Sequence, residues 1–441
     1  MKLITKALIG TGAFGAGYGI YRAGRRALSY QPLEYFDING FVEPGYEPVR
    51  QAFIDNFRHR AELGGAVCVY RDGEKVVDLW GGVRDRATMA PWEEDTMVVV
   101  YSTTKGIAAM TIALANSRGL IDYDERVASY WPEFAQNGKE NITVRQLLAH
   151  QAGLFAFDEP VDKETVRDLD RLAEVLARAR PAWEPGTRQG YHAISLGFYE
   201  GELIRRVDPL HRSPGQYFLD EIAQPLGLDF HIRLPNSIPN SRLAVVESPN
   251  FMKLLWGFPF QLTLDTLSPR SNIYRALVTN PGSAIVHDEE TIYSRDLEVP
   301  SGGGVGTAEA IAQAYGEFAS GGKVLGLRKL TLDALAAPAV EPSTLGFYDE
   351  CMRGEAKFSL GFMKPCAAWP FHEPAAYGHP GAGGSIGFAD PAARIGFAYV
   401  TNRMGTSLAG DQREIALRDA LYSCAPIASP LPASTLSATA G

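Results

Sequence analysis

The chain contains 441 residues, the length of two or three domains, and its 46% hydrophobic and 21% charged residues are typical of a globular protein with a sizeable core. Its 42 basic and 51 acidic residues give a net charge of −9, which disfavours nucleic acid as a partner. The four cysteines are far apart and lack metal-ligand spacing, so we expect no disulfide framework, no metal and no cofactor.

Residues 1–33 form a basic leader with a charge of +5, which leaves −14 for the rest of the chain. Between its basic ends, residues 7–21 are uncharged and glycine-rich, but a helix of this length would measure only about 22 Å and would not span a bilayer core of roughly 30 Å. Arg22 follows the apolar run directly, which is unlike a cleaved signal peptide. We expect an uncleaved membrane-proximal or targeting segment, with a disordered terminus as the alternative; without membrane attachment the protein would be cytoplasmic.

The same leader contains a glycine pattern that resembles a nucleotide-binding loop. Residues 10–15 read GTGAFG and fit G-x-G-x-x-G. A dinucleotide site also needs a strand-helix-strand unit and an acid about twenty residues later. The acid at that distance, Glu34, stands in a loop-like stretch before Pro44, and no strand pattern follows where one is needed. We interpret the match as accidental.

Two antiparallel hairpins are predicted near opposite ends of the compact part of the chain. The Asp72-Gly73 pair supplies a left-handed turn in the first. A helix over residues 45–62 precedes this hairpin, and an amphipathic helix over residues 411–424 follows the second. The predicted strands are residues 65–70 and 75–79, and residues 385–390 and 395–402.

Helical patterns broken by proline and glycine fill the chain between the two hairpins. The predicted fold class is therefore α/β or α+β: an antiparallel β-sheet flanked by helices, with an inserted, mostly α-helical domain. The expected divisions are a leader over 1–33, a discontinuous α/β catalytic domain over 34–115 and 291–424, a helical domain over 116–290, and a disordered tail over 425–441.

Ser102-x-x-Lys105 is the first pattern that suggests chemistry. It opens a run, residues 106–115, that is apolar on nearly every face and predicts a buried helix. Residues at i and i+3 share a helix face, so the lysine amine can reach the serine hydroxyl, and burial at a helix N-terminus lowers the pKa of a lysine. The same letters also fit an N-cap serine followed by a surface lysine, so the pattern alone leaves both readings open.

Six stretches in the same order and spacing decide between these readings, because together they resemble the serine β-lactamase and penicillin-binding-protein superfamily. More narrowly, the chain resembles the class C β-lactamase-like esterases of lipolytic family VIII over residues 38–424. The stretches are DLWGG (78–82), PWEEDTMVVVYSTTKG (91–106), ITVRQLLAHQAGL (142–154), WEPGTRQGYHAISLGF (183–198), SGGGVGT (301–307) and YGHPGAGGSIGFADP (377–391).

The resemblance implies roles for individual residues. Ser102 matches the nucleophile, Lys105 its partner, and Tyr191 the tyrosine of the family's Tyr-x-Asn element; it leaves open whether Lys105 or Tyr191 is the base. The backbone N–H groups of Ser102 and Ala382 would form the oxyanion hole, since Pro380 has no N–H.

Two departures from the family pattern concern the substrate pocket. The resemblance places His379, Gly381 and His192 at this pocket, although either histidine could be structural and held by backbone hydrogen bonds. Ala193 stands where lactamases carry Asn, and His379 where they carry Lys, so the groups that hold a lactam are missing. These departures favour an esterase over a β-lactamase.

A second serine motif competes with Ser102. Residues 383–387 read GGSIG and fit the G-x-S-x-G elbow of α/β-hydrolases, with Ser385 as the nucleophile. An elbow requires a helix after the serine, whereas a hairpin is predicted here. We therefore interpret Ser385 as a strand or turn residue.

The predicted function is a serine carboxylesterase that cleaves small-molecule esters through an acyl-enzyme on Ser102. If an alcohol or amine replaced water, the same site would be an acyltransferase, and a D-Ala-D-Ala carboxypeptidase or β-lactamase is another alternative. A catalytically silent binding or scaffold protein is the alternative of a different class. The intact set of Ser102, Lys105 and Tyr191 argues against it.

Overall fold

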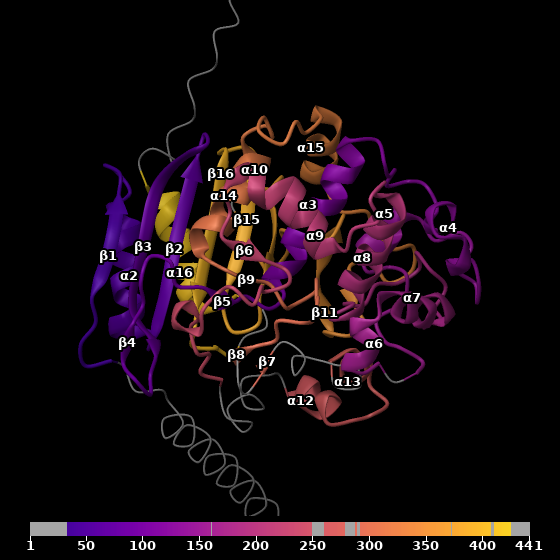
Figure 1. Ribbon diagram of the computed structural model, residues 1–441, viewed down its shortest axis with the longest axis horizontal. Helices are drawn as coiled ribbons and strands as arrows, with labels where there is room; N and C mark the ends of the chain where they lie inside the picture. Colours follow the sequence, from indigo (N-terminus) through magenta and orange to yellow (C-terminus); the bar gives the residue numbers. More distant parts are fainter. Residues whose placement is uncertain are drawn as a thin grey trace, which may run out of the picture.

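The computed structural model describes residues 33–159, 161–248, 260–277, 287–288, 292–371, 373–406 and 410–424. Its centre is an antiparallel sheet in the order β1-β3-β2-β16-β15-β14-β13-β12, with β4 paired to β3. Figure 1 shows β1, β3, β2, β16 and β15 in this order. This sheet confirms the predicted fold class. Its strands are β1 (Ile38–Val42), β2 (Gly64–Arg71), β3 (Glu74–Asp85), β4 (Ala90–Pro91), β12 (Lys357–Ser359), β13 (Phe362–Lys364), β14 (Tyr377–Pro380), β15 (Ile386–Asp390) and β16 (Ile395–Thr401).

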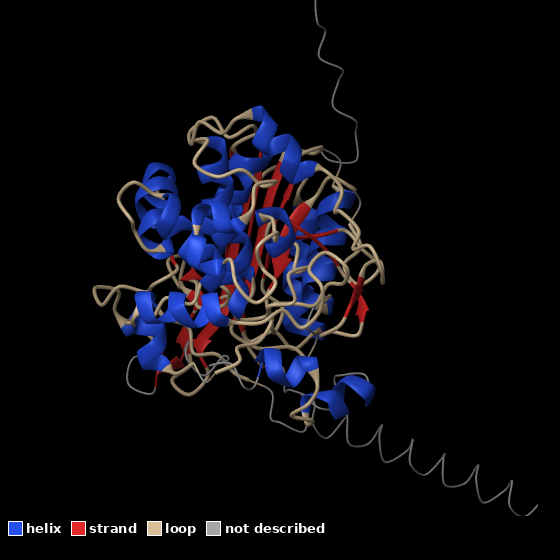
Figure 2. Cartoon of the chain, turned by 90° about the vertical axis from the view of Figure 1, so that its right-hand side faces the viewer, coloured by secondary structure: helices blue, strands red, loops and turns tan. Residues whose placement is uncertain are grey.

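Helices cover the sheet, and many of them lie in front of it when the molecule is seen from its helical side (Figure 2). The longer helices are α2 (Glu47–His59), α3 (Thr103–Ser117), α7 (Leu169–Arg178), α8 (Ser195–Val207), α14 (Ala308–Ala319), α15 (Lys329–Ala336) and α16 (Gln412–Ser423). The shorter ones are α4 (Val127–Tyr130), α5 (Val144–Leu148), α6 (Lys163–Arg167), α9 (Pro214–Phe218), α10 (Gln224–Leu226), α12 (Phe260–Thr266) and α13 (Asn272–Leu277), with single turns at Pro132–Phe134, Leu219–Ala223 and Asn240–Arg242.

Short strands outside the main sheet form small sheets of their own in the described part of the chain. They pair β5 (Val98–Val99) and β6 (Phe230–His231) with β9 (Val305–Gly306), β7 (His287–Asp288) with β8 (Ile292–Tyr293), and β10 (Tyr348–Asp349) with β11 (Gly354–Glu355).

Both predicted hairpins are present and lie side by side, because β2 pairs with β16. In the first hairpin Asp72 and Gly73 have φ values of 54° and 86°, the left-handed turn that the sequence predicts. Segments more than 300 residues apart thus form the middle of one sheet, and their pairing brings the two ends of the compact chain together.

The central strands are buried on both faces, with large side chains on one and small ones on the other. In β2, Val67 and Val69 pack with α2 and α16, whereas Cys68 belongs to the opposite cluster, which contains α3 and α14. Helix α14 comes very close to this second face, since a Cβ added at Gly396 would lie 2.1 Å from the backbone nitrogen of Gly316. Only glycine permits this approach.

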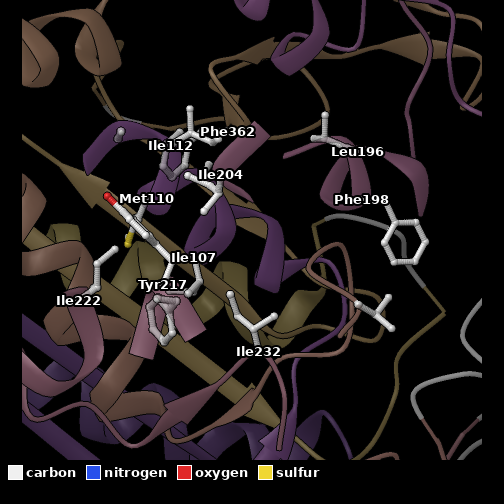
Figure 3. Packing of buried hydrophobic residues seen from close by; sticks show 14 of the residues in the cluster. Ile107, Met110, Ile112, Leu196, Phe198, Ile204, Tyr217, Ile222, Ile232 and Phe362 are labelled. Carbon is white, nitrogen blue, oxygen red and sulfur yellow. The ribbon is translucent and has the colours of Figure 1, made fainter. Parts of the chain in front are cut away.

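Helix α3 is buried along nearly its whole length, as its apolar sequence predicts. Its residues Ile107, Met110 and Ile112 share one hydrophobic cluster with Leu196 and Ile204 of α8 (Figure 3). Packing of α8 against α3 places the segment before α8 next to the start of α3, where Ser102 lies. The division into catalytic and helical domains stays a prediction.

Helix α16 differs from the amphipathic helix that we expected. Its inward face carries Arg413, Glu414 and Arg418 in addition to leucines. Arg413 donates to Glu62 at 3.0 Å, and Arg418 donates to the carbonyl of Pro370 at 2.6 Å. Buried charges of this kind are tolerated because they are paired, but they remove the contrast between an apolar and a polar face.

Two of the sequence predictions concern segments that lie outside the described residues: the leader, except for Leu33, and the tail from residue 425. In the described part of the chain, no helix is both long enough and apolar enough to cross a membrane.

Candidate active site

Ser102 lies at the start of α3 with its side chain free for chemistry. It occupies the N-cap position, but its hydroxyl makes no capping hydrogen bond, and its own backbone is already helical at φ −64°. The preceding Tyr101 has φ 47°, a left-handed conformation that is costly for a bulky residue and is typical of functional sites. The reading of Ser102 as an ordinary N-cap is therefore wrong.

Lys105 lies one turn along α3 with its amine directed at Ser102. Its Nζ is 3.2 Å from Ser102 Oγ, and it donates hydrogen bonds to the carbonyls of Ala193 at 2.6 Å and Ser301 at 2.7 Å. The side chain is fully buried, so it is not the surface lysine of the alternative reading. Burial lowers the pKa of Lys105 to about 7, and the charge of Glu200 opposes part of this decrease.

The three contacts of Lys105 can be made by the ammonium, which has three N–H donors, and also by the uncharged amine. A neutral –NH₂ group has two N–H donors, which the two carbonyls accept, and one lone pair, which is left for the Ser102 hydroxyl. With a pKa of about 7, a large fraction of the lysine is in this form at neutral pH. The arrangement can accept the proton of Ser102, which is what a general base must do.

Tyr191 completes the group around the nucleophile. Its ring centre is 4.9 Å from Lys105 Nζ, and its hydroxyl has a hydrogen-bonding interaction with the Ser102 side chain. The backbone N–H of Tyr191 donates to Asp349, which holds the loop before α8 in place. Burial raises the pKa of Tyr191, opposed by its interaction with Ser102, so its hydroxyl is protonated at neutral pH.

The residues on and after β14 lie beside this group. The His379 ring stacks on that of Tyr191 with 5.9 Å between centres; its Nδ1 is 2.7 Å from the Pro380 carbonyl, and its buried Nε2 has no hydrogen-bond partner among the described residues. Burial lowers the pKa of His379 to about 3, so the ring is uncharged. The carbonyl next to Nδ1 requires a proton there, which leaves Nε2 as an acceptor.

Gly381 and Ala382 follow in the turn after β14. A Cβ at Gly381 would lie 2.2 Å from the carbonyl of Val100, so only glycine fits beside the residues that lead to the nucleophile. In the part of the chain that the structure describes, neither Ala382 N–H nor Ser102 N–H donates to another protein group. Both amides are thus available to a substrate oxygen.

His192 does not support the predicted role in the substrate pocket. The ring is fully buried, its Nε2 accepts from the backbone N–H of Leu154 at 2.9 Å, and its Nδ1 is 2.6 Å from the Gly190 carbonyl. Both nitrogens are therefore used by the backbone. The His192 N–H in turn donates to Nδ1 of His150 at 2.9 Å, so the two histidines form a structural pair beneath Tyr191.

Ser385 is placed as a structural residue, as the sequence suggests. Its Oγ donates to the carbonyl of Val100 at 2.9 Å and lies 3.3 Å from Thr103 Oγ1, and it precedes strand β15 rather than a helix. It ties the turn after β14 to the start of α3. Among the residues that the structure describes, no amine or imidazole forms a hydrogen bond with Ser385 Oγ.

The sequence did not single out the two carbonyls that hold Lys105. Ser301 belongs to the glycine-rich stretch 301–307, and Ala193 stands where lactamases carry Asn, but neither residue type indicates a lysine contact. A main-chain carbonyl has no signal in the sequence, so such contacts cannot be found from residue types. Among the described residues, no cluster of His, Cys, Asp and Glu is placed to bind a metal ion.

Comparison with known proteins agrees with this geometry. A family model described as Beta-lactamase matches residues 51–421. The esterase/beta-lactamase LipL of Mycobacterium tuberculosis is 34% identical over 369 residues, which are 83% of each chain.

Solved structures show the same relationship. The crystal structure of a family VIII carboxylesterase is 36% identical, with a TM-score of 0.78 over 88% of this chain and 100% of that chain. EstA from Arthrobacter nitroguajacolicus Rue61a is 30% identical, with a TM-score of 0.74 over 87% of this chain and 98% of that chain. The match of one family model across most of the chain, with the sheet and the Ser-Lys-Tyr group described above, shows that the chain belongs to the beta-lactamase family.

Proposed function

We propose that the protein is a serine hydrolase that cleaves carboxylic esters through an acyl-enzyme. The observation that carries the proposal is the setting of Lys105, whose Nζ lies 3.2 Å from Ser102 Oγ while two carbonyls accept its N–H groups. A serine beside an uncharged amine is what nucleophilic acyl transfer requires. The similarity to LipL and to a family VIII carboxylesterase supports esters as the substrate class.

In the acylation step, Ser102 Oγ attacks the ester carbonyl carbon while its proton moves to Lys105 Nζ. The oxygen that becomes negative accepts hydrogen bonds from the N–H groups of Ser102 and Ala382. When the bond to the alcohol breaks, the alcohol oxygen takes the proton of the Tyr191 hydroxyl, and Lys105 returns a proton to Tyr191. The products are a free alcohol and an ester of Ser102.

The deacylation step uses the same residues with water in place of Ser102. Lys105, again an amine, accepts a proton from water as the water attacks the acyl carbon. The bond to Ser102 Oγ breaks, Ser102 Oγ takes the proton back from the Lys105 ammonium, and the carboxylic acid leaves. We assign the base role to Lys105 because its pKa is lowered to about 7, whereas that of Tyr191 is raised.

Two features support an ester rather than a lactam as substrate. His379 is uncharged at neutral pH, so it does not offer the positive charge with which a lysine at this position would hold a carboxylate. Ala193 has no side-chain amide to hold the acyl side chain, and its carbonyl is already bound to Lys105. Uncharged esters therefore match the site better than anionic lactams.

The test is covalent labelling of three proteins: the wild type, Ser102→Ala and Ser385→Ala. After incubation with a fluorophosphonate or an activated short-chain ester, intact-protein mass is measured beside hydrolysis of p-nitrophenyl esters. We expect one adduct and turnover in the wild type and most of both in Ser385→Ala, but neither in Ser102→Ala. An adduct that persists in Ser102→Ala, or disappears in a folded Ser385→Ala protein, would show that the nucleophile is misassigned.

A further inference from the structure

Glu200 is a buried acid that the proposed steps do not use. It lies in α8, its side chain is 1% exposed, and neither carboxyl oxygen has a hydrogen-bond partner among the described residues. An ionised carboxylate without partners is costly in a protein interior, so such a group keeps its proton. Burial accordingly raises the pKa of Glu200 to about 8, while the charge of Lys105 acts in the opposite direction.

The Glu200 carboxyl lies beside α3, the helix that carries Lys105. Gly361 lies over it: a Cβ at this glycine would be 2.9 Å from Glu200 Oε1 and 2.5 Å from the Cβ of Ala109. Ala109 follows Lys105 by one turn of α3, and side chains at i and i+4 share a face. The carboxyl therefore lies near Gly361 between α3 and α8, beside the part of α3 that is one helical turn after Lys105.

The other titratable groups around Lys105 are uncharged at neutral pH. Burial lowers the pKa of each neighbouring histidine and raises that of the neighbouring tyrosine; these groups are His150, His192, His379 and Tyr191. Glu200 is the one acid in the described part of the chain whose charge acts on Lys105, and Lys105 is the one base that acts on Glu200. The two groups thus form an isolated electrostatic pair in the interior.

We propose that Glu200 is a positioning residue for Lys105. While Glu200 is protonated, the resting lysine has no counter-charge and is therefore an amine. Once Glu200 is ionised, it stabilises the ammonium that forms when Lys105 accepts the Ser102 proton. This inference rests on the proposed function, in which Lys105 is the base. Its physical basis is that a charge in a low-dielectric interior acts strongly on a nearby opposite charge.

The proposal is tested with the pH profile of kcat/KM of the full chain on an uncharged ester. Above the pH at which Glu200 ionises, near 8, the wild type should gain activity by roughly threefold or more, because the transition state carries an ammonium on Lys105. Glu200→Gln should keep the acid limb near pH 7 and lose this second rise. Glu200→Met is the replacement if the glutamine variant does not fold, and the expected profile is the same.

Glu414→Gln is the matched control. Glu414 is also buried, neither of its oxygens makes a hydrogen bond among the described residues, and burial raises its pKa to about 7. It lies on α16 behind the sheet, however, and its charged neighbour is Arg418 at 3.7 Å. This variant should reproduce the wild-type profile. Infrared difference spectra of the wild type should also show the loss of a protonated carboxyl near pH 8 that is absent in the Glu200 variants.

Each outcome of this experiment is decisive. Wild-type and Glu200→Gln profiles that superimpose at all pH values would overturn the proposal and leave Lys105 as the base. An acid limb that moves to lower pH in Glu200→Gln would also overturn it, because the resting carboxyl would then be an anion. A wild-type profile without any acid limb near pH 7 would instead contradict the proposed function itself.

Discussion

Acidification is expected to switch off the enzyme through one group, Lys105. Its pKa is lowered to about 7, so the amine fraction falls tenfold for each pH unit below that value. The ionisation of Lys105 alone should make kcat/KM about tenfold lower at pH 6 and about 100-fold lower at pH 5 than with the lysine fully in the amine form; the rise assigned to Glu200 near pH 8 adds to this difference. The sign is fixed by the chemistry, since the protonated lysine cannot accept the Ser102 proton.

The assay is the initial rate on a short-chain p-nitrophenyl ester between pH 5 and pH 9, read at the isosbestic wavelength of the product. Circular dichroism at each pH separates loss of activity from loss of structure. The nearby histidines do not account for this limb, because burial lowers the pKa of His192 to about 4 and that of His379 to about 3.

A second buried lysine provides the control for this prediction. Lys364 on β13 donates to the carbonyl of Leu335 at 2.8 Å, and burial lowers its pKa to about 7 as well. Lys364→Met should keep the acid limb, whereas Lys105→Ala should lose the activity by roughly 10²-fold or more at every pH. A flat wild-type profile, or a limb that vanishes in a folded Lys364→Met protein, would refute the assignment of Lys105.

Three further predictions follow from the site and the leader. Tyr191→Phe should lower kcat by roughly 10²-fold or more on an alkyl ester, whose alcohol needs a proton, and by less on a p-nitrophenyl ester; equal losses on both would remove Tyr191 as the acid. Gly381→Ala should lower the free energy of unfolding by about 1–3 kcal/mol, measured in urea, because its Cβ would collide with the carbonyl of Val100, and an unchanged transition would contradict this packing. Removal of residues 1–33, which carry +5, should abolish sedimentation with anionic vesicles and leave kcat unchanged; retained sedimentation would place the membrane contact elsewhere.

The parts of the site that could be predicted are those that depend on local spacing. Ser102 and Lys105 are three residues apart on a helix, so the sequence itself places them on one face. The Asp72-Gly73 turn has a conformation that few other residue pairs adopt, and the structure confirms it. In both cases the geometry is set within a few residues.

The parts that could not be predicted depend on contacts between distant segments. The partners of His192 are backbone groups, and no residue type reveals them. The charges on the inner face of α16 have the same cause: Arg413 is buried because Glu62, far away in the sequence, is there to pair with it. The hydrophobic periodicity of a sequence indicates which residues are apolar, but it does not indicate which charged residues have ion-pair partners elsewhere in the chain.

The two carbonyls that hold Lys105 have a consequence for the newly made chain. In an unfolded chain a lysine has its ordinary pKa, and only about one molecule in three thousand carries the amine at pH 7. The Ala193 carbonyl comes from the segment before α8 and the Ser301 carbonyl from the segment before β9, so both must dock before the amine is enclosed. Ser102 therefore has its amine neighbour in place only once the chain has been synthesised beyond Ser301, so we expect a shorter nascent chain not to react with substrate esters.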